Sequence, residues 1–202
     1  RMINLDSERD GEIFAGCAGG NKVSCRLPIK WIPTVGNVWK IHISGLQGGH
    51  SGIDINKGRA CAIRLLGRIL YRLSCSGTMY VADACGGQAD NAISDETYAV
   101  IAAQESVDVK AVIAEMESAF REEYRITDPN LCIETQPAEN CSAMLDRDST
   151  YRLICLLQCA PQGVEEMSAD IPGLPQTSAN LGILRVRPEE IYSEFCVRSA
   201  VA

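Results

Sequence analysis

The stretch VWKIHISGLQGGHSG, residues 38–52, joins a strand pattern to a glycine-rich turn. Over about 38–46, apolar and polar residues alternate with the period of two that is typical of a half-buried strand. Beyond the turn, apolar residues recur at helical spacing, which predicts a helix over about 57–74. The glycines around His50 let the backbone approach a ligand closely. One of only two histidines therefore lies at a strand-to-helix corner, held by the scaffold but free to face a substrate.

The rest of the chain continues this succession of strands and helices. Strands are predicted at about 77–84, 96–104, 131–135, 179–187 and 190–199, and helices from about 107 and over 146–159, the latter capped by Asp146 or Asp148. Glycines and prolines predict a crossover over 16–33 and a loop over 163–176. The order is βαββα followed by βαββ, as in one ferredoxin-like unit and a second that is cut short. We therefore expect an α+β fold, an antiparallel sheet with helices on one face, divided into sub-units at about 36–127 and 128–202.

Composition limits the classes of partner. The 202 residues are 46% hydrophobic and 22% charged, which is typical of a globular chain that can bury a core. The net charge of -7 argues against nucleic acid, because a phosphate-binding surface needs clustered Lys and Arg. No apolar run approaches the roughly twenty residues of a membrane-spanning helix, so no membrane partner is expected. The ten cysteines lie mostly in apolar periodic segments without Cys-x-x-Cys spacing, which favours reduced thiols in the cytoplasm.

The two histidines differ in what their surroundings predict. His50 is a candidate for contacting a reacting group, with the alternative that it only hydrogen-bonds the backbone of its own turn. His42 lies in the middle of a predicted strand and is expected to be structural or to face solvent. No His-Glu-x-x-His motif is present, so a metal site built from this chain alone has little support. Asp6 and Glu8, at a strand end, could hold a cation but are too few for a catalytic zinc site.

Further polar residues lie beside glycines or within an apolar strand. Asn91, after the turn Gly86-Gly87, could direct its amide at a carboxylate or oxyanion, or make only the backbone bonds of a turn asparagine. The segment TSANLG at 177–182 has the same character. Arg198 fits a substrate carboxylate if it is buried, and is otherwise a strand-edge arginine in solvent. Neither a Gly-x-Ser-x-Gly elbow nor a phosphate-binding loop is present.

Several motifs, taken in order, resemble one known family. They are INLDSE at 3–8, GEIFAGCAGG at 11–20, GLQGGHSG at 45–52, NAI at 91–93, GV at 163–164, TSANLG at 177–182 and VRS at 197–199. Over essentially its whole length the chain is similar to the aminoacylhistidine dipeptidases (Xaa-His dipeptidases, or cytosolic non-specific dipeptidases), which are two-zinc metallopeptidases with a lid domain. Each motif is modest alone, but their shared order and spacing make the resemblance specific.

The resemblance implies a chain in two parts. Residues 1–20 correspond to a stub of the zinc-binding catalytic domain, and residues 21–202 to the lid, which mediates a homodimer and closes over a dipeptide substrate. The other catalytic groups of the family lie outside this chain, so the two zinc ions expected in the full-length enzyme are not expected to be retained. The chain alone is therefore expected not to hydrolyse Xaa-His or other dipeptides.

The resemblance also implies roles for particular residues. Asp6 matches a terminal zinc ligand, and His50 matches the lid histidine that stabilises the tetrahedral oxyanion, often across the dimer. Asn91 and Arg198 match residues that help bind the carboxylate of the substrate or its transition state. The proline that commonly follows Asn-Ala-Ile in the family is Ser94 here, which is a departure from the pattern.

Two other interpretations stay open. A free-standing ferredoxin-like module could use its glycine turns to bind a small ligand or to regulate a partner, without metal. Such a module needs no NLDSE segment at 4–8, so that segment favours the dipeptidase. An aminoacylase or deacylase of the same lid-bearing group would share the chemistry but not the substrate, and the CAGG segment at 17–20 favours the dipeptidase here as well.

Overall fold

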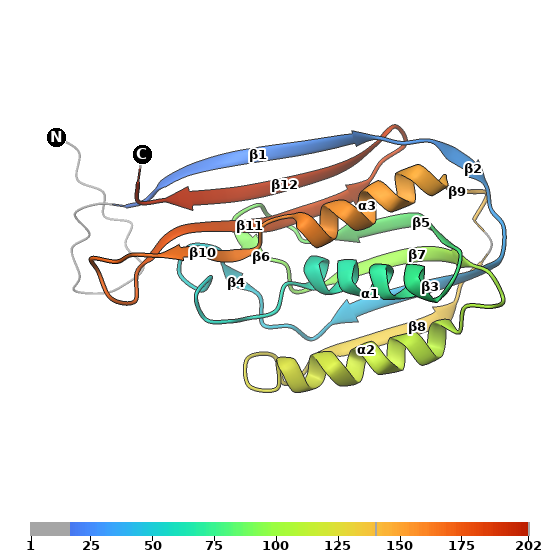
Figure 1. The fold of residues 1–202 in the computed structure, drawn as a ribbon, viewed down its shortest axis with the longest axis horizontal. Coiled ribbons are helices and arrows are strands. Elements are labelled where there is room, and N and C mark those ends of the chain that lie inside the picture. The colour runs from blue at the N-terminus through green and yellow to red at the C-terminus, as the bar shows by residue number, and fades with distance from the viewer. Residues whose placement is uncertain (1–16, 140, 202) are drawn as a thin grey trace.

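The computed structural model describes residues 17–139 and 141–201 of the chain. Three helices lie on one face of a large antiparallel sheet (Figure 1). The helices are α1 (Ala62–Ser76), α2 (Val109–Glu123) and α3 (Arg147–Cys159). The strands are β1 (Gly19–Pro28), β2 (Trp31–Pro33), β3 (Asn37–Ser44), β4 (Gly49–His50), β5 (Met79–Gly86), β6 (Ala92–Ile93), β7 (Thr97–Ala103), β8 (Cys132–Pro137), β9 (Ala143–Leu145), β10 (Gly163–Met167), β11 (Pro175–Val186) and β12 (Glu190–Ser199). The predicted α+β class is confirmed.

One half of the sheet is a ferredoxin-like unit. Its elements follow the order β3-α1-β5-β7-α2-β8, and its strands are paired in the order β5-β7-β3-β8. The strand at 132–137, which the order of elements placed in a second sub-unit at 128–202, pairs with β3 and completes this first unit. Strand pairing is set by long-range contacts, which the local sequence pattern does not contain.

The remaining elements extend the same sheet instead of forming a separate one. β11 pairs with the edge of β5, β12 pairs with β11, and β1 is the outermost strand. α3 packs beside α1, so the helical layer is extended in the same direction (Figure 1). One hydrophobic core contains buried side chains from both parts, among them Ile101 of β7 and Leu184 of β11.

The crossover predicted over 16–33 is wrong for most of its length. Residues Gly19–Pro28 form β1, which pairs residue by residue with β12. Its half-buried Cys25 and Leu27 pack against the core, and its glycines and proline lie at its ends. An edge strand tolerates proline and glycine at such positions, so these residues do not exclude a strand here.

The loop predicted over 163–176 contains a strand in its first part. β10 (Gly163–Met167) pairs antiparallel with β11, so the Pro-Gly segment that follows is the turn of a hairpin. The loop was predicted from Pro172, Gly173 and Pro175, which lie in the turn and at the start of β11, outside β10.

One helix begins at its predicted cap, and another begins later than predicted. Asp146 accepts a hydrogen bond from the backbone N–H of Ser149 at 2.8 Å, so it, and not Asp148, is the N-cap of α3. The first helix begins at Ala62, later than the predicted 57, because the residues just before it form turns. No helix in the described ranges is long and apolar enough to cross a membrane.

Candidate functional site

His50 lies where two short strands bring two glycine turns together. β4 (Gly49–His50) pairs with β6 (Ala92–Ile93), and the backbone N–H of Ser51 donates to the carbonyl of Asn91 at 2.9 Å. This corner lies at the left-hand end of the molecule in Figure 1, beside the ends of β11 and β12. The two turns that the sequence singled out separately are therefore neighbours.

The His50 ring is oriented by its own turn. Its Nδ1 accepts a hydrogen bond from the backbone N–H of Gly52 at 3.2 Å. An accepting Nδ1 carries no proton in the neutral ring, so the proton is on Nε2. Within residues 17–139 and 141–201, Nε2 has no hydrogen-bond partner, and the ring is half-buried. His50 therefore presents an N–H donor in a fixed orientation. The alternative interpretation of His50 was that it only hydrogen-bonds the backbone of its own turn. That hydrogen bond is present, but it uses Nδ1 alone.

Asp54 fixes the backbone of His50 through two hydrogen bonds. Its Oδ2 accepts from the N–H of His50 at 2.8 Å, and its own N–H donates to the carbonyl of His50 at 2.9 Å. The other oxygen accepts from Lys57 Nζ at 2.6 Å. The hydrogen bond from Lys57, and then that from the His50 N–H, lower the pKa of Asp54 below its ordinary value. Sequence reasoning missed Asp54, although its spacing of four from His50 suits a local turn.

Gly49 leaves space for the side chains of Asp54 and Arg59. An ideal Cβ at Gly49, where φ is 137°, would lie 2.6 Å from Oδ2 of Asp54. Arg59 fills the same space and donates from Nη1 to the carbonyl of Gly48 at 2.6 Å. The glycine is therefore required for its left-handed backbone and for this close approach.

Gly52 brings Arg198 to the same corner. An ideal Cβ at Gly52 would lie 3.1 Å from Cε1 of His50 and 3.3 Å from Cζ of Arg198, so the glycine lies between the ring and the guanidinium. Arg198 Nε is buried and has no hydrogen-bond partner in the part of the chain that the structure describes. The fold thus gathers His50 and Arg198, which come from β4 and β12.

Asn91 and Arg198 line one hollow of about 280 Å³, together with Lys22 and Asp90. Asn91 is exposed and, among the described residues, its side-chain amide has no hydrogen-bond partner. Lys22 forms an ion pair with Asp90 at 2.9 Å, and that hydrogen bond raises the pKa of Lys22. The hollow therefore presents the amide of Asn91 and the guanidinium of Arg198 to a ligand, while Asp90 is paired with Lys22.

Asn180 holds the turn that carries Asn91. Its side chain is 1% exposed, and Nδ2 donates to the carbonyls of Asp90 and Ala92, both at 2.8 Å. Its Oδ1 accepts from Gln162 Nε2 at 3.2 Å. The TSANLG segment is therefore part of β11, and its asparagine positions a neighbouring turn instead of facing a ligand.

The remaining predicted residues lie apart from this corner or outside the described part. His42, in β3, accepts or donates a hydrogen bond with Glu96 at 2.6 Å and is half-buried. Asp6 lies outside the described residues. Among residues 17–139 and 141–201, no group of three or more His, Cys, Asp or Glu side chains could hold a metal ion. The corner can donate hydrogen bonds to a negatively charged group.

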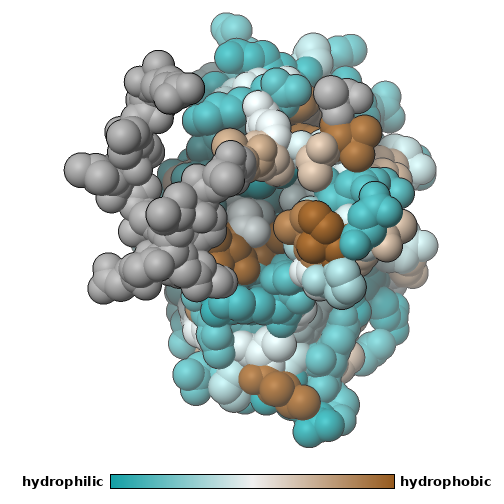
Figure 2. Space-filling model, turned by 90° about the vertical axis from the view of Figure 1, so that its left-hand side faces the viewer, coloured by the Kyte–Doolittle hydropathy of each residue, from teal (hydrophilic) through white to brown (hydrophobic). Residues whose placement is uncertain are grey.

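Figure 2 shows this end of the molecule in space-filling form. Where the described residues form the surface, it is largely hydrophilic, and hydrophobic side chains make separate patches. Ile53, three residues after His50, is 43% exposed. A mainly hydrophilic surface with separate hydrophobic patches suits a small polar ligand that has some apolar surface.

Comparisons with known proteins agree with the resemblance drawn from the motifs. Residues 41–128 match the family model of the peptidase dimerisation domain. The chain is 32% identical over 204 residues to the cytosol non-specific dipeptidase of Escherichia coli (strain K12), covering 99% of this chain and 42% of that protein. It superposes on the aminoacylhistidine dipeptidase of Vibrio alginolyticus with a TM-score of 0.87 and 26% identity, covering 96% of this chain and 40% of that one. The chain thus spans less than half the length of either relative.

Proposed function

We propose that this chain, whose residues 41–128 match a peptidase dimerisation domain, is the lid and dimerisation region of a zinc-dependent dipeptidase that hydrolyses Xaa-His and other dipeptides. The observation that carries the proposal is the corner at His50, where one ring N–H is oriented and free beside a guanidinium. The likeness to two dipeptidases over almost the whole chain supports it. Residues 21–202 would form the lid, and residues 1–20 the end of the catalytic domain.

His50 would stabilise the charge that develops on the scissile carbonyl oxygen. Its Nε2–H is a preorganised donor, because Gly52 fixes the ring and Asp54 fixes the backbone. A donor aimed at a developing oxyanion contributes on the order of a hundredfold to a thousandfold to the rate. Arg198 and Asn91 would bind the substrate carboxylate, since both line one hollow and a guanidinium pairs well with carboxylates.

The metal would be bound elsewhere in the full-length enzyme. The two zinc sites would be built by the catalytic domain. Asp6, which matches a terminal zinc ligand by the resemblance, lies outside the described residues. When bound, zinc ions supply an activated water for hydrolysis. The groups of this chain would bind the substrate and stabilise the oxyanion.

The partners follow from the same proposal. The lid would form a homodimer, and the dipeptide would bind at the corner near His50, with neither nucleic acid nor membrane as a partner. We propose the cytoplasm as the location, which the name of the Escherichia coli relative supports.

The proposal is tested by His50→Ala in the full-length enzyme. We expect kcat to fall about a hundredfold or more while zinc content stays unchanged, because the ring would donate to the oxyanion and does not bind metal. His42→Ala is the matched control, since His42 lies in β3, bonded to Glu96, and should leave turnover unchanged. Dipeptide hydrolysis and bound zinc are measured for all three proteins. Normal turnover in His50→Ala would contradict the role of His50.

A further inference from the structure

A wide cleft lies at the other end of α1 from His50. It has a volume of about 830 Å³ and lies between the end of α1, the start of α3 and the start of β5. α1 has 15 residues and rises by 1.5 Å per residue, so its two ends are about 22 Å apart. The cleft is therefore well separated from the corner at His50 within this chain.

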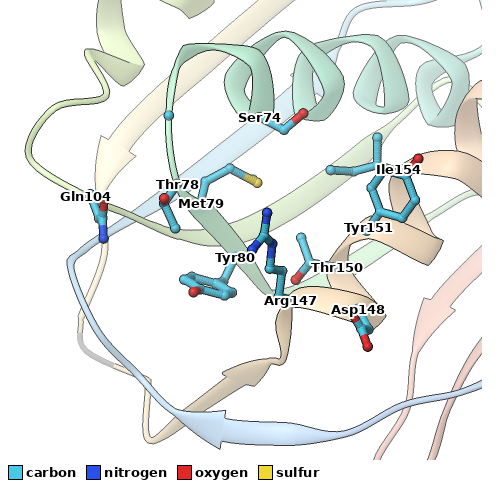
Figure 3. Close-up of a pocket in the computed structure, with 11 residues that line it drawn as sticks. Ser74, Thr78, Met79, Tyr80, Gln104, Arg147, Asp148, Thr150, Tyr151 and Ile154 are labelled. Carbon is cyan, nitrogen blue, oxygen red and sulfur yellow. The ribbon is translucent and has the colours of Figure 1, made fainter.

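Arg147 supplies a positive charge to this cleft. Figure 3 shows its guanidinium pointing into the space between Met79 and Ile154. Within residues 17–139 and 141–201 it has no carboxylate partner, whereas Arg68 and Arg72 on α1 pair with glutamates of α2. Arg147 is also the first residue of α3, where the helix dipole favours an anion. A carboxylate is the matching group.

The facing helix end supplies the opposite charge. α1 ends at Ser76, and Ser74 and Gly77 from this end line the cleft. The last turn carries no basic side chain, and Arg72, just before it, donates from Nη1 to the Ser76 hydroxyl at 3.1 Å. The carbonyls at a helix C-terminus carry partial negative charge and attract a cation. Asp148 lines the same cleft and adds a carboxylate. Because α1 and α3 are antiparallel here, the two unlike helix ends meet across one cleft (Figure 1).

Apolar and aromatic side chains line the cleft together with the polar Thr78, Gln104 and Thr150. Met79 and Ile154 are 6% and 4% exposed and contribute to the bottom of the cleft. The rings of Tyr80 and Tyr151 lie on opposite sides of Arg147 in Figure 3. Such rings bind flat apolar groups by stacking or edge contacts.

We propose that this cleft binds a zwitterionic amino acid or dipeptide with an aromatic side chain. Its carboxylate would pair with Arg147, its ammonium would face Asp148 and the end of α1, and its ring would lie over Met79 and Ile154. Free amino acids are products and dipeptides are substrates of the hydrolysis proposed above, so any regulatory meaning rests on that proposed function. The binding itself does not depend on it.

Calorimetric titration of the full 202-residue chain with L-phenylalanine tests the inference. We expect saturable binding, and at least tenfold weaker binding of N-acetyl-L-phenylalanine, which lacks the ammonium, and of L-phenylalaninamide, which lacks the carboxylate. Alanyl-phenylalanine distinguishes the two sources of the zwitterion. Tighter binding of the dipeptide assigns the cleft to substrate, and tighter binding of the amino acid assigns it to product.

Two variants locate the binding. Arg147→Gln should weaken L-phenylalanine binding at least tenfold, because the variant removes the carboxylate partner. Arg152→Gln is the matched control, since Arg152 is exposed on the same helix but does not line the cleft, and its binding should be unchanged. Absent binding, equal binding by Arg147→Gln, or equal binding of the amide would overturn the inference. None of these results bears on the His50 experiment, which measures hydrolysis.

Discussion

At His50 the backbone and the ring have different partners. Asp54 holds the backbone through two hydrogen bonds, and the Gly52 N–H holds the ring through one. Because Asp54 also accepts from Lys57, its negative charge draws two donors to one carboxylate. The geometry of the corner therefore depends on the ionisation of a residue that would not contact the substrate.

Replacing Asp54 by Asn should make the protein less stable at neutral pH, by about 1–2 kcal/mol, because charge-assisted hydrogen bonds are lost. The pKa of Asp54 is lowered in the folded chain, so its charge stabilises the fold above the ordinary value of 3.8. That stabilisation is lost as the pH falls below 3.8 toward the lower folded value. Urea unfolding of both proteins at pH 7, 5, 4 and 3 measures the difference, which should shrink toward acid.

Asp170→Asn is the control for this effect, because Asp170 is exposed and its carboxylate has no ion-pair partner in the described ranges. It should change stability little at any of these pH values. A difference between wild type and Asp54→Asn that did not depend on pH would contradict the role of the charge.

At the scale of elements, the contact between α1 and α3 depends on Gly67. An ideal Cβ there would lie 2.6 Å from Cβ of Leu157, closer than real Cβ contacts. The glycine lies in the middle of a helix, where alanine is ordinarily preferred by about 1 kcal/mol. The close approach of the two helices therefore outweighs intrinsic helix propensity at this position.

Gly67→Ala should lower the free energy of unfolding by about 1–3 kcal/mol, because the added methyl group overpacks the contact. Gly20→Ala is the control, since its ideal Cβ would be 3.8 Å from the nearest atom, the carbonyl oxygen of Val197. Thermal and urea unfolding compare the three proteins. A gain in stability for Gly67→Ala would show that the helices move apart at little cost.

Local sequence patterns predicted elements better than their pairing. Periodicity found all three helices, and a capping pattern found Asp146, because both depend on residues within one or two turns. The strand at Gly19–Pro28 was missed because its partner, β12, is at the other end of the chain. The site shows the same limit. His50 was recognised from its own turn, whereas the contact with Arg198 exists only because β12 lies beside that turn.

At the scale of the whole molecule, one core joins the two parts of the chain. Ile101 and Leu184, from the ferredoxin-like unit and from its extension, belong to the same buried cluster. β11 covers the edge of β5, and α3 covers one side of α1. Separating the extension would expose both surfaces to water.

The chain should therefore unfold in one cooperative transition. Trp39 packs against the core from β3, so in a Trp31→Phe variant, which removes the other tryptophan, its fluorescence reports on the first unit. Far-UV circular dichroism reports on helices of both parts. The two signals should share one midpoint in urea. Two separate midpoints would mean that the sub-units proposed at 36–127 and 128–202 fold independently.

The pairing of β1 with β12 has a consequence for synthesis on the ribosome. Gly19 pairs with Ser199, so β1 is made well before its partner strand β12. The ferredoxin-like unit, which ends with β8, has all its strands before β12 appears. During that interval Cys25 and Leu27 of β1 lack the partner strand that holds them against the core, and an unpaired strand of this kind favours aggregation of an incomplete chain.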